Sequence, residues 1–505
     1  MRILNRALLV SAFGGLTALV AACPASLDDR CANGTCDPSA SSSSGEGGTD
    51  GGGDSVPPGC DPAADSNDQK SDACATDDFG MFVDAAGAAD APGTRSQPVK
   101  TIALALAKRG TRSRIYVCEG SYPERISLQA AVTILGGFTC GSWSFGSKPT
   151  LLRPTESGPA VEIRSVQGAF TISDIDVLAP SGSSASPSSV AAFVSNTPAL
   201  TLRRTRLAAQ TGASGKSADP GTNGALVSST PQAATLNGTP GSALLGGASQ
   251  ACTCSNGGTT AGGRGGDPGG VDKDGQAGTI APVAPATFEP PTATGQGSTR
   301  DDCEMLSVGG RVGSAGASGA DGDGAKATFG DVTSDGWLPA AGNNGKHGIA
   351  GQGGGGGGGS GGAGGGGSGA CGGCGGHGGE GGGGGGGSIA ILALNSPITL
   401  VAVELKSARA GNGGNGGTGG DGMDGGMRAN PTGGGCFGGN GGKGGKGGAG
   451  GGGRGGLAGA LIYKGAKPIG APVVTKGTKG DKGQGGSPGN NDGLDGDAVE
   501  QLEIK

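Results

Sequence analysis

Short runs of apolar residues recur along the chain in four segments that align with one another. Two of them read SVAAFVSNTPALTLRRTRLAAQTG from Ser189 and SIAILALNSPITLVAVELKSARAG from Ser388, and the other two begin at Ala160 and Leu457. Each segment predicts a strand, a tight turn, a second strand and a final glycine, within about 22 residues. A unit of this size cannot bury its apolar face alone. The pattern therefore predicts coils of a parallel β-solenoid, which stack although long sequences separate them.

A different apolar spacing precedes these segments. Val99, Ile102, Ala103 and Leu106 lie on one face of a helix, and Gly110 stands where such a helix would end. We therefore predict a helix over 98–109. The short strand-like runs SRIYV, AVTILGGF and TLLRP follow it.

The stretches PVKTI, IYVCEGSYPERISL and TILGGF resemble the opening of the right-handed parallel β-helix proteins of the pectin-lyase-like group. The likeness extends over about 79–178 and is greatest to bacterial surface lipoproteins of uncharacterised function. It implies that the helix over 98–109 caps the first coil. The expected fold is thus all-β, a right-handed parallel β-helix, with coils in 73–211, 388–410 and 457–476 and a last strand in 498–505.

Glycine-rich excursions separate the predicted coils, at 212–387, 411–456 and 477–497, and the chain contains 120 glycines. Glycine often falls at every third position, as from 310 to 322 and from 477 to 486. A period of three is typical of the polyproline-II helix. Collagen is disfavoured because the phase breaks often and proline is scarce. Two alternatives remain: extended helices packed side by side through backbone hydrogen bonds, or disordered low-complexity loops.

The first 22 residues carry Arg2 and Arg6, then an apolar run and small residues, as in a secretory signal peptide. The run ends in VAAC, which resembles the lipobox of bacterial lipoproteins, so lipidation of Cys23 is expected. Residues 23–72 are rich in Ser, Gly and Asp and predict a flexible tether. The sequence therefore predicts an exported protein, anchored through lipid in the outer membrane or at the cell surface.

Charge and cysteine content narrow the possible partners. Removal of residues 1–22 changes the formal net charge from −6 to −8, and an acidic chain with dispersed basic residues has no footprint for nucleic acid. Without Cys23, twelve of the 13 cysteines remain, an even number that suits disulfides in an exported protein. The candidates are close in sequence, and spacing leaves their connectivity open: Cys31 and Cys36, Cys60 and Cys74, Cys118 and Cys140. The last two are about one coil apart, so we expect them to bridge neighbouring coils.

One row of residues contains side chains of the kind that bind metals. Cys371, Cys374, His377 and Glu380 stand three apart in ACGGCGGHGGEGG. In an extended helix of three residues per turn, successive members of such a row are about 9 Å apart, too far to share one zinc ion. We therefore interpret the row as part of the repeat, with the cysteines oxidised or free, and expect no metal and no cofactor.

Catalytic candidates are few. In TISDIDV, alternation directs Phe170 and Ile172 inward, and Asp174 and Asp176 are expected at a turn, facing water. The basic run at 203–206 has no basic counterpart in the next coil, so no ladder of basic residues is expected. From these candidates we assign no catalytic residues.

Two hypotheses follow. The first is a structural, adhesive or other binding role without catalysis, with extracellular polysaccharide or other surface proteins as partners. The second is a polysaccharide lyase or hydrolase, or a carbohydrate-binding module. Clustered outward charges and aromatic residues on adjacent coils would favour the second.

Overall fold

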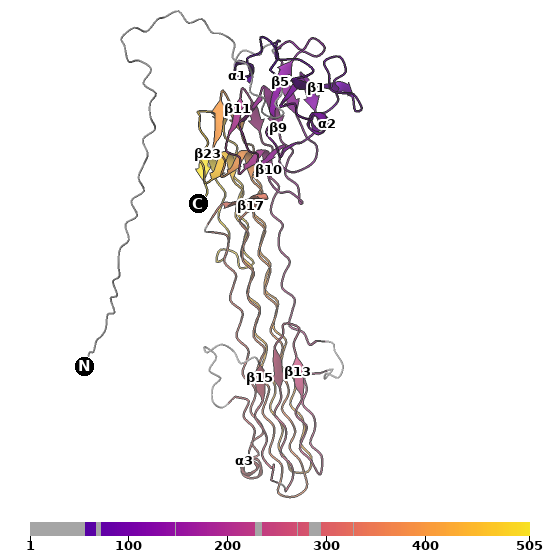
Figure 1. Ribbon diagram of the computed structural model, residues 1–505. Helices are drawn as coiled ribbons and strands as arrows, with labels where there is room; N and C mark the ends of the chain where they lie inside the picture. The colour runs from indigo at the N-terminus through magenta and orange to yellow at the C-terminus, as the bar shows by residue number, and fades with distance from the viewer. Residues whose placement is uncertain are drawn as a thin grey trace, which may run out of the picture. The chain divides into compact units, whose positions relative to one another are not determined.

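The computed structural model describes residues 56–66, 72–146, 148–227, 235–269, 271–281, 294–326 and 328–505. This part of the chain is mostly β, and its main feature is three six-stranded sheets in which all neighbouring strands are parallel (Figure 1). Such parallel sheets are compatible with a β-helix.

The strands of each sheet follow one another in chain order. Sheet 1 contains β1 (Gly80–Ala88), β2 (Arg114–Cys118), β5 (Thr133–Phe138), β8 (Phe170–Ser173), β11 (Leu200–Arg203) and β19 (Ile398–Val401). Sheet 2 contains β3 (Gly120–Tyr122), β6 (Thr150–Leu152), β9 (Ile175–Leu178), β12 (Arg206–Ala208), β20 (Glu404–Lys406) and β22 (Val473–Thr475). Sheet 3 contains β4 (Ile126–Leu128), β7 (Val161–Arg164), β10 (Ser189–Ser195), β18 (Ser388–Leu394), β21 (Ala458–Lys464) and β23 (Ala498–Glu503).

From β2 to β21, apart from the strands within the excursions, the chain visits sheets 1, 2 and 3 in turn, and we call one such passage a rung. In the last rung an isolated β-bridge from Ile469 to Thr399 stands in place of a sheet 1 strand. In sheet 3, Ser189 lies opposite Ser388, which lies opposite Ala458, so the repeated segments stack in the order that their alignment predicts. Asn196 and Asn395 occupy equivalent corners with φ of 49° and 48°. Asparagine tolerates this left-handed conformation better than most residues, which explains its recurrence in the repeat.

An apolar core fills the space enclosed by the three sheets. Alternation along each strand sends every second side chain inward. Phe170 and Ile172 are buried, as expected from the sequence, and so are Ile391 and Leu405 from rungs beyond the first excursion. One continuous core therefore joins segments that are far apart in the chain.

The helices are short: α1 (Pro62–Ser66), α2 (Ile102–Lys108) and α3 (Arg300–Leu306). The helix predicted over 98–109 begins only at Ile102, because Val99 forms β-bridges to β1 and Thr101 is the N-cap. The carboxylate of Glu124 accepts hydrogen bonds from the backbone N–H groups of Ile102 and Ala103, which fixes the helix start against the first rung. No helix among the described residues is long and apolar enough to cross a bilayer.

The predicted tether, 23–72, includes an ordered part. Residues 56–66 pack beside the first rung, where Asp65 is fully buried and pairs with Arg114 at 2.9 Å. A disulfide from Cys60 to Cys74 closes this segment. The prediction of a flexible tether is therefore wrong for 56–66, because composition does not reveal a buried ion pair.

The three excursions all leave between a strand of sheet 2 and the next strand of sheet 3: after β12, after β20 and after β22. Their described parts, which we call the glycine bundle, are extended segments that run alongside one another (Figure 1). The bundle also holds a small antiparallel sheet and a hairpin, formed by β13 (Ala251–Thr253), β14 (Thr259–Ala261) and β15 (Thr279–Ala281), and by β16 (Gly330–Thr333) and β17 (Gly336–Pro339).

Backbone hydrogen bonds between these segments repeat every three residues. Gly376, Gly379 and Gly382 donate to the carbonyls of residues 445, 448 and 451, at 3.0, 2.9 and 2.9 Å. A Cβ on Gly379 would lie 2.1 Å from the carbonyl oxygen of Gly417, so these backbones approach as closely as only glycine permits. Of the two alternatives for the excursions, their described parts have the packed one.

Candidate binding site

The outer faces of the three sheets differ in how they are covered. On sheet 3, the hairpin β16–β17 covers apolar residues of β10, β18 and β21, and Phe193 and Leu392 belong to the cluster that they form. A cluster around Phe82 and Trp143 covers the start of sheet 1. The outer face of sheet 2 carries charged side chains in register, and it is where we place the candidate binding site.

Three outward positions on successive rungs of sheet 2 carry charges of alternating sign. Asp176 on β9 lies opposite Arg206 on β12, and Arg206 lies opposite Glu404 on β20. The inward neighbours Val177, Leu207 and Leu405 are buried, so the charged residues point outward. A search for basic residues in the coil after the basic run 203–206 missed this ladder, because the residue that matches Arg206 there is its acidic partner, Glu404.

The charged side chains of this row interact with their neighbours of opposite sign. Arg206 Nε lies 3.5 Å from Glu404 Oε1, and both side chains are about half exposed, 47 % and 43 %. The pKa of Asp176 is raised, first by burial and also by Glu404 and Asp174, while a backbone hydrogen bond and the charge of Arg206 oppose the shift. An exposed pair of this kind contributes about 0–1 kcal/mol to stability.

A hollow of about 460 Å³ lies over the row. Its lining combines charged and small apolar side chains from four rungs: Leu151, Asp176, Val177, Leu178, Arg206, Ala208, Ala209, Gln210, Thr211, Lys406 and Ala408. The lining of this hollow contains no aromatic side chain. Tyr116, Tyr122 and Trp143 are buried, and Trp143 Nε1 donates to the carbonyl of Arg95.

Asp174 does not join Asp176 as a water-facing carboxylate. It lies at a corner with φ of 56°, and Arg204 binds both of its oxygens, with Nε–Oδ1 at 2.8 Å and Nη2–Oδ2 at 2.9 Å. Its side chain is only 11 % exposed. The expectation that both aspartates face water is therefore wrong for Asp174, because the turn brings an arginine of the next rung onto it.

The two cysteines of the row 371–380 form disulfides. Cys371 pairs with Cys252 and Cys374 pairs with Cys254, so neither sulfur is available as a thiolate ligand. A third disulfide, Cys303–Cys436, joins the first excursion to the second. The sequence contains one signal for these pairs, because Cys252-x-Cys254 and Cys371-x-x-Cys374 each supply two cysteines. Their spacing alone does not show which cysteine of one motif bonds to which cysteine of the other.

The remaining ligand-type residues of the row have separate environments. His377 Nε2 lies 3.0 Å from Ser255 Oγ, and the ring centroids of His377 and His347 are 4.9 Å apart. His347 Nδ1 accepts a hydrogen bond from the backbone N–H of Gly378, and Glu380 is exposed. Among the described residues, one group of three potential ligands lies within reach of a single ion, Asp84 with Cys118 and Cys140, and its two sulfurs are bonded to each other.

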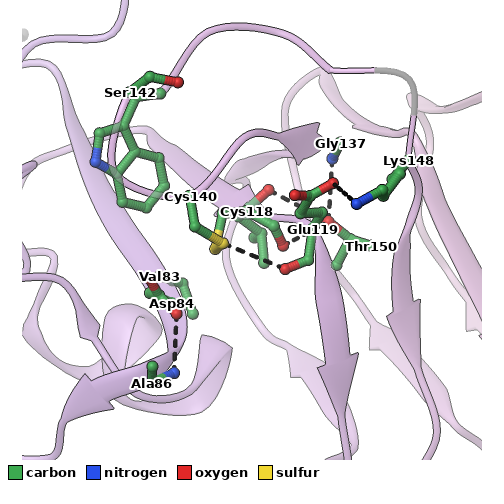
Figure 2. Close-up of a disulfide and its surroundings, with 12 residues drawn as sticks. Val83, Asp84, Ala86, Cys118, Glu119, Gly137, Cys140, Ser142, Lys148 and Thr150 are labelled. Atoms are coloured by element: carbon green, nitrogen blue, oxygen red, sulfur yellow. Dashed lines mark hydrogen bonds and ion pairs between the residues drawn. A yellow bond between two sulfur atoms is a disulfide. The ribbon is translucent and has the colours of Figure 1, made fainter.

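Figure 2 shows that disulfide. Cys118 ends β2 and Cys140 follows β5, so the bond joins neighbouring rungs, with a Cα separation of 5.1 Å. This is the pairing that the 22-residue spacing suggested. Cys60 pairs with Cys74. Cys23, Cys31 and Cys36 lie outside the described residues.

Comparisons of the whole chain with family models, with curated proteins and with solved structures give no match.

Proposed function

We propose that the protein is an exported, lipid-anchored lipoprotein of the cell surface with a structural or adhesive binding role and no catalysis. Its sheets belong, in this proposal, to a right-handed parallel β-helix of the pectin-lyase-like type, and Cys23 carries the lipid.

The observation that carries the proposal is the glycine bundle. Three excursions leave the sheets at one corner, and backbone hydrogen bonds hold their described parts in register. Two disulfides lie within the first excursion, and a third joins the first excursion to the second. Disulfides are suited to an oxidising compartment outside the cytoplasm. Long stretches of the chain thus form an ordered support whose exposed side chains are available for contacts, as expected for a binding protein.

The test is expression of the full chain in a bacterial host with an outer membrane. Membrane fractionation and protease treatment of whole cells should find the wild type in the membrane fraction and accessible from outside. Cys23→Ala should move it to the soluble fraction. Wild-type protein in the soluble fraction, without lipid on its N-terminus by mass spectrometry, would refute the anchor.

Adhesion is measured with the same cells on immobilised extracellular polysaccharides and on cells of the same host. Cells that carry the wild type should adhere more strongly than cells that carry Cys23→Ala. Equal adhesion of the two would remove the adhesive role.

The hollow over sheet 2 favours a second candidate, binding or cleavage of an acidic polysaccharide, because Arg206 and Lys406 line it together with Asp176. A carboxylate with a raised pKa suits proton transfer. However, Arg206 already lies between Asp176 and Glu404, which fits a structural ladder. Release of unsaturated or reducing sugars from uronic-acid polymers, lost in Asp176→Asn but not in Asp331→Asn, would favour an enzyme over the first proposal.

A further inference from the structure

Large exposed apolar side chains gather at one end of the glycine bundle. Three segments carry them: the turn 242–246, the turn 267–274 (described except for residue 270) and the last turn of α3. The most exposed are Leu244 at 82 %, Val271 at 100 % and Met305 at 75 %, and Leu245 and Leu306 are also exposed. We call these five residues the apolar tip. Along the bundle, the outer rows 412–421, 440–446 and 478–484 expose Asn, Thr, Asp, Lys and Gln instead.

Contacts between the turns place the five residues at the same end. Gly246 N–H donates to Asp267 Oδ1 at 2.6 Å, and Asp267 N–H donates to the carbonyl of Asp272. Arg300 N–H donates to Asp274 Oδ1 at 2.7 Å, which links α3 to the second turn. Figure 1 shows α3 at the end of the bundle that is distant from the three parallel sheets.

The turns are fixed before any partner arrives. The disulfide Cys303–Cys436 fastens α3 to the second excursion, and Cys303 is buried. Arg264, just before the second turn, pairs with Asp267 at 2.6 Å. Because these contacts hold the backbone, the surface is preformed, and a preformed surface binds with a smaller entropy cost.

The charges around the tip have one predominant sign. Five exposed carboxylates surround it: Asp272, Asp274, Asp301, Asp302 and Glu304. The basic residues Arg264, Lys273 and Arg300 are half-buried, and Arg264 and Arg300 are in ion pairs with acidic neighbours. The field at the tip is therefore negative, which disfavours an anionic lipid surface and a second copy of the same tip.

We propose that the apolar tip is a docking surface for a protein partner that presents an apolar patch bordered by lysine and arginine. Contiguous exposed apolar residues with a polar rim are typical of interaction sites. Apolar burial supplies affinity, and the carboxylates around the rim supply orientation and faster association. This inference rests on the proposed binding role and deepens it, but it does not require the lipid anchor.

The probe is a short amphipathic helical peptide of leucine and lysine, titrated onto the purified chain without residues 1–23 and followed by fluorescence anisotropy. The comparison peptide has glutamate in place of lysine. The tip variant combines Leu244→Ser, Val271→Ser and Leu306→Ser. The matched control replaces three exposed apolar residues elsewhere, Leu338→Ser, Ile469→Ser and Val473→Ser. Both variants change surface positions, and unchanged melting curves establish that they fold.

The leucine–lysine peptide should bind the wild type and the control alike, and the tip variant at least about tenfold more weakly. Asp301→Asn with Asp302→Asn should weaken binding and reduce its salt dependence. Equal binding by the tip variant, equal binding of the glutamate peptide, or no binding at all would overturn the proposal. Tip-dependent binding to phosphatidylcholine vesicles instead of the peptide would assign the surface to a membrane. Tip-dependent dimers in sedimentation would assign it to a second copy. Retention of Cys23→Ala in the membrane fraction concerns only the anchor, so the two failures are distinguishable.

Discussion

The stacked sheets and the glycine bundle keep one chain ordered by opposite means. The sheets enclose a core of Ile, Leu, Val and Phe side chains, and removal of this apolar surface from water drives their folding. The bundle contains long runs whose neighbours meet backbone to backbone, as at Gly379 and Gly417. The first region depends on side chains, whereas the second depends on their absence.

The difference shows where cross-links are needed. A backbone hydrogen bond contributes a net of about 0.5–1.5 kcal/mol, and fixing one residue costs about 1–2 kcal/mol, most for glycine. Hydrogen bonds alone therefore do not offset the entropy of ordering the bundle. Of the five disulfides in the described residues, three lie in the bundle, at positions that close loops of 119, 120 and 133 residues. Attachment to the sheets at one corner adds a further constraint.

Ile391→Ala should give the largest effect, because it removes a fully buried side chain from the core between rungs. We expect a loss of about 2–5 kcal/mol in the free energy of unfolding of the sheets. Denaturant unfolding followed by circular dichroism measures it. Leu338→Ala, at a position that is 60 % exposed, is the control and should change stability by less than about 0.5 kcal/mol. Equal stability of Ile391→Ala and the wild type would contradict a side-chain core.

Removal of the disulfide Cys254–Cys374 by two alanine substitutions should destabilise the bundle by about 2–4 kcal/mol, because the bond closes a loop of 120 residues. Hydrogen exchange by mass spectrometry should show faster exchange in 363–387 and unchanged exchange in sheet 1. The control removes Cys60–Cys74, whose loop is 14 residues, and should leave the bundle unaffected. If the two variants exchanged alike in 363–387, the cross-link would have no special role there.

Gly379→Ala tests whether the bundle depends on the absence of a side chain, because it adds a single methyl group between two backbones. Its Cβ would lie 2.1 Å from the carbonyl oxygen of Gly417, and the neighbouring backbones would have to separate, at a cost of about 1–3 kcal/mol. Gly362→Ala is the matched control, since nothing lies within 4 Å of its Cβ. The same hydrogen-exchange measurement should detect the first and not the second. Similar exchange in both variants would mean that close approach is not what the glycines provide.

Acid should weaken the bundle through His377, with the smallest effect of the four predicted changes. The pKa of His377 is lowered, first by burial and then by the nearby His347. A histidine whose folded pKa is below its unfolded value stabilises the fold above about pH 6.5, and this contribution is lost as the pH falls through the window below that value.

The measurement compares exchange in 340–387 at pH 7.5 and pH 5, corrected for the intrinsic rate. Asp492, whose pKa is lowered to about 2 by Lys482, remains ionised throughout, so the carboxylate contribution of that pair is constant. His377→Gln should remove most of the pH dependence. Persistence of the full dependence in that variant would assign it to another group.

Some features of the site were within reach of the sequence and others were not. Alternation correctly directed Phe170 and Ile172 inward, and the repeat aligned Ser189 with Ser388, because both follow from the local period of two. Arg204 on Asp174 and Arg206 on Glu404 are contacts between rungs. Their geometry depends on register and corner conformation, which one rung does not contain.

The sequence by itself determined the strand units, their order of stacking and the period of three in the glycine excursions, because these depend on local residue spacing. Tertiary structure alone decided which extended segments are neighbours, which cysteines of the glycine bundle pair and where the apolar tip is assembled. Residues such as Cys254 and Cys374, or Leu244 and Val271, come together only after many backbones have packed. In a region built from nearly identical glycine triplets, local sequence offers almost equal alternatives for pairing, and the few side chains that differ select among them only in the folded molecule.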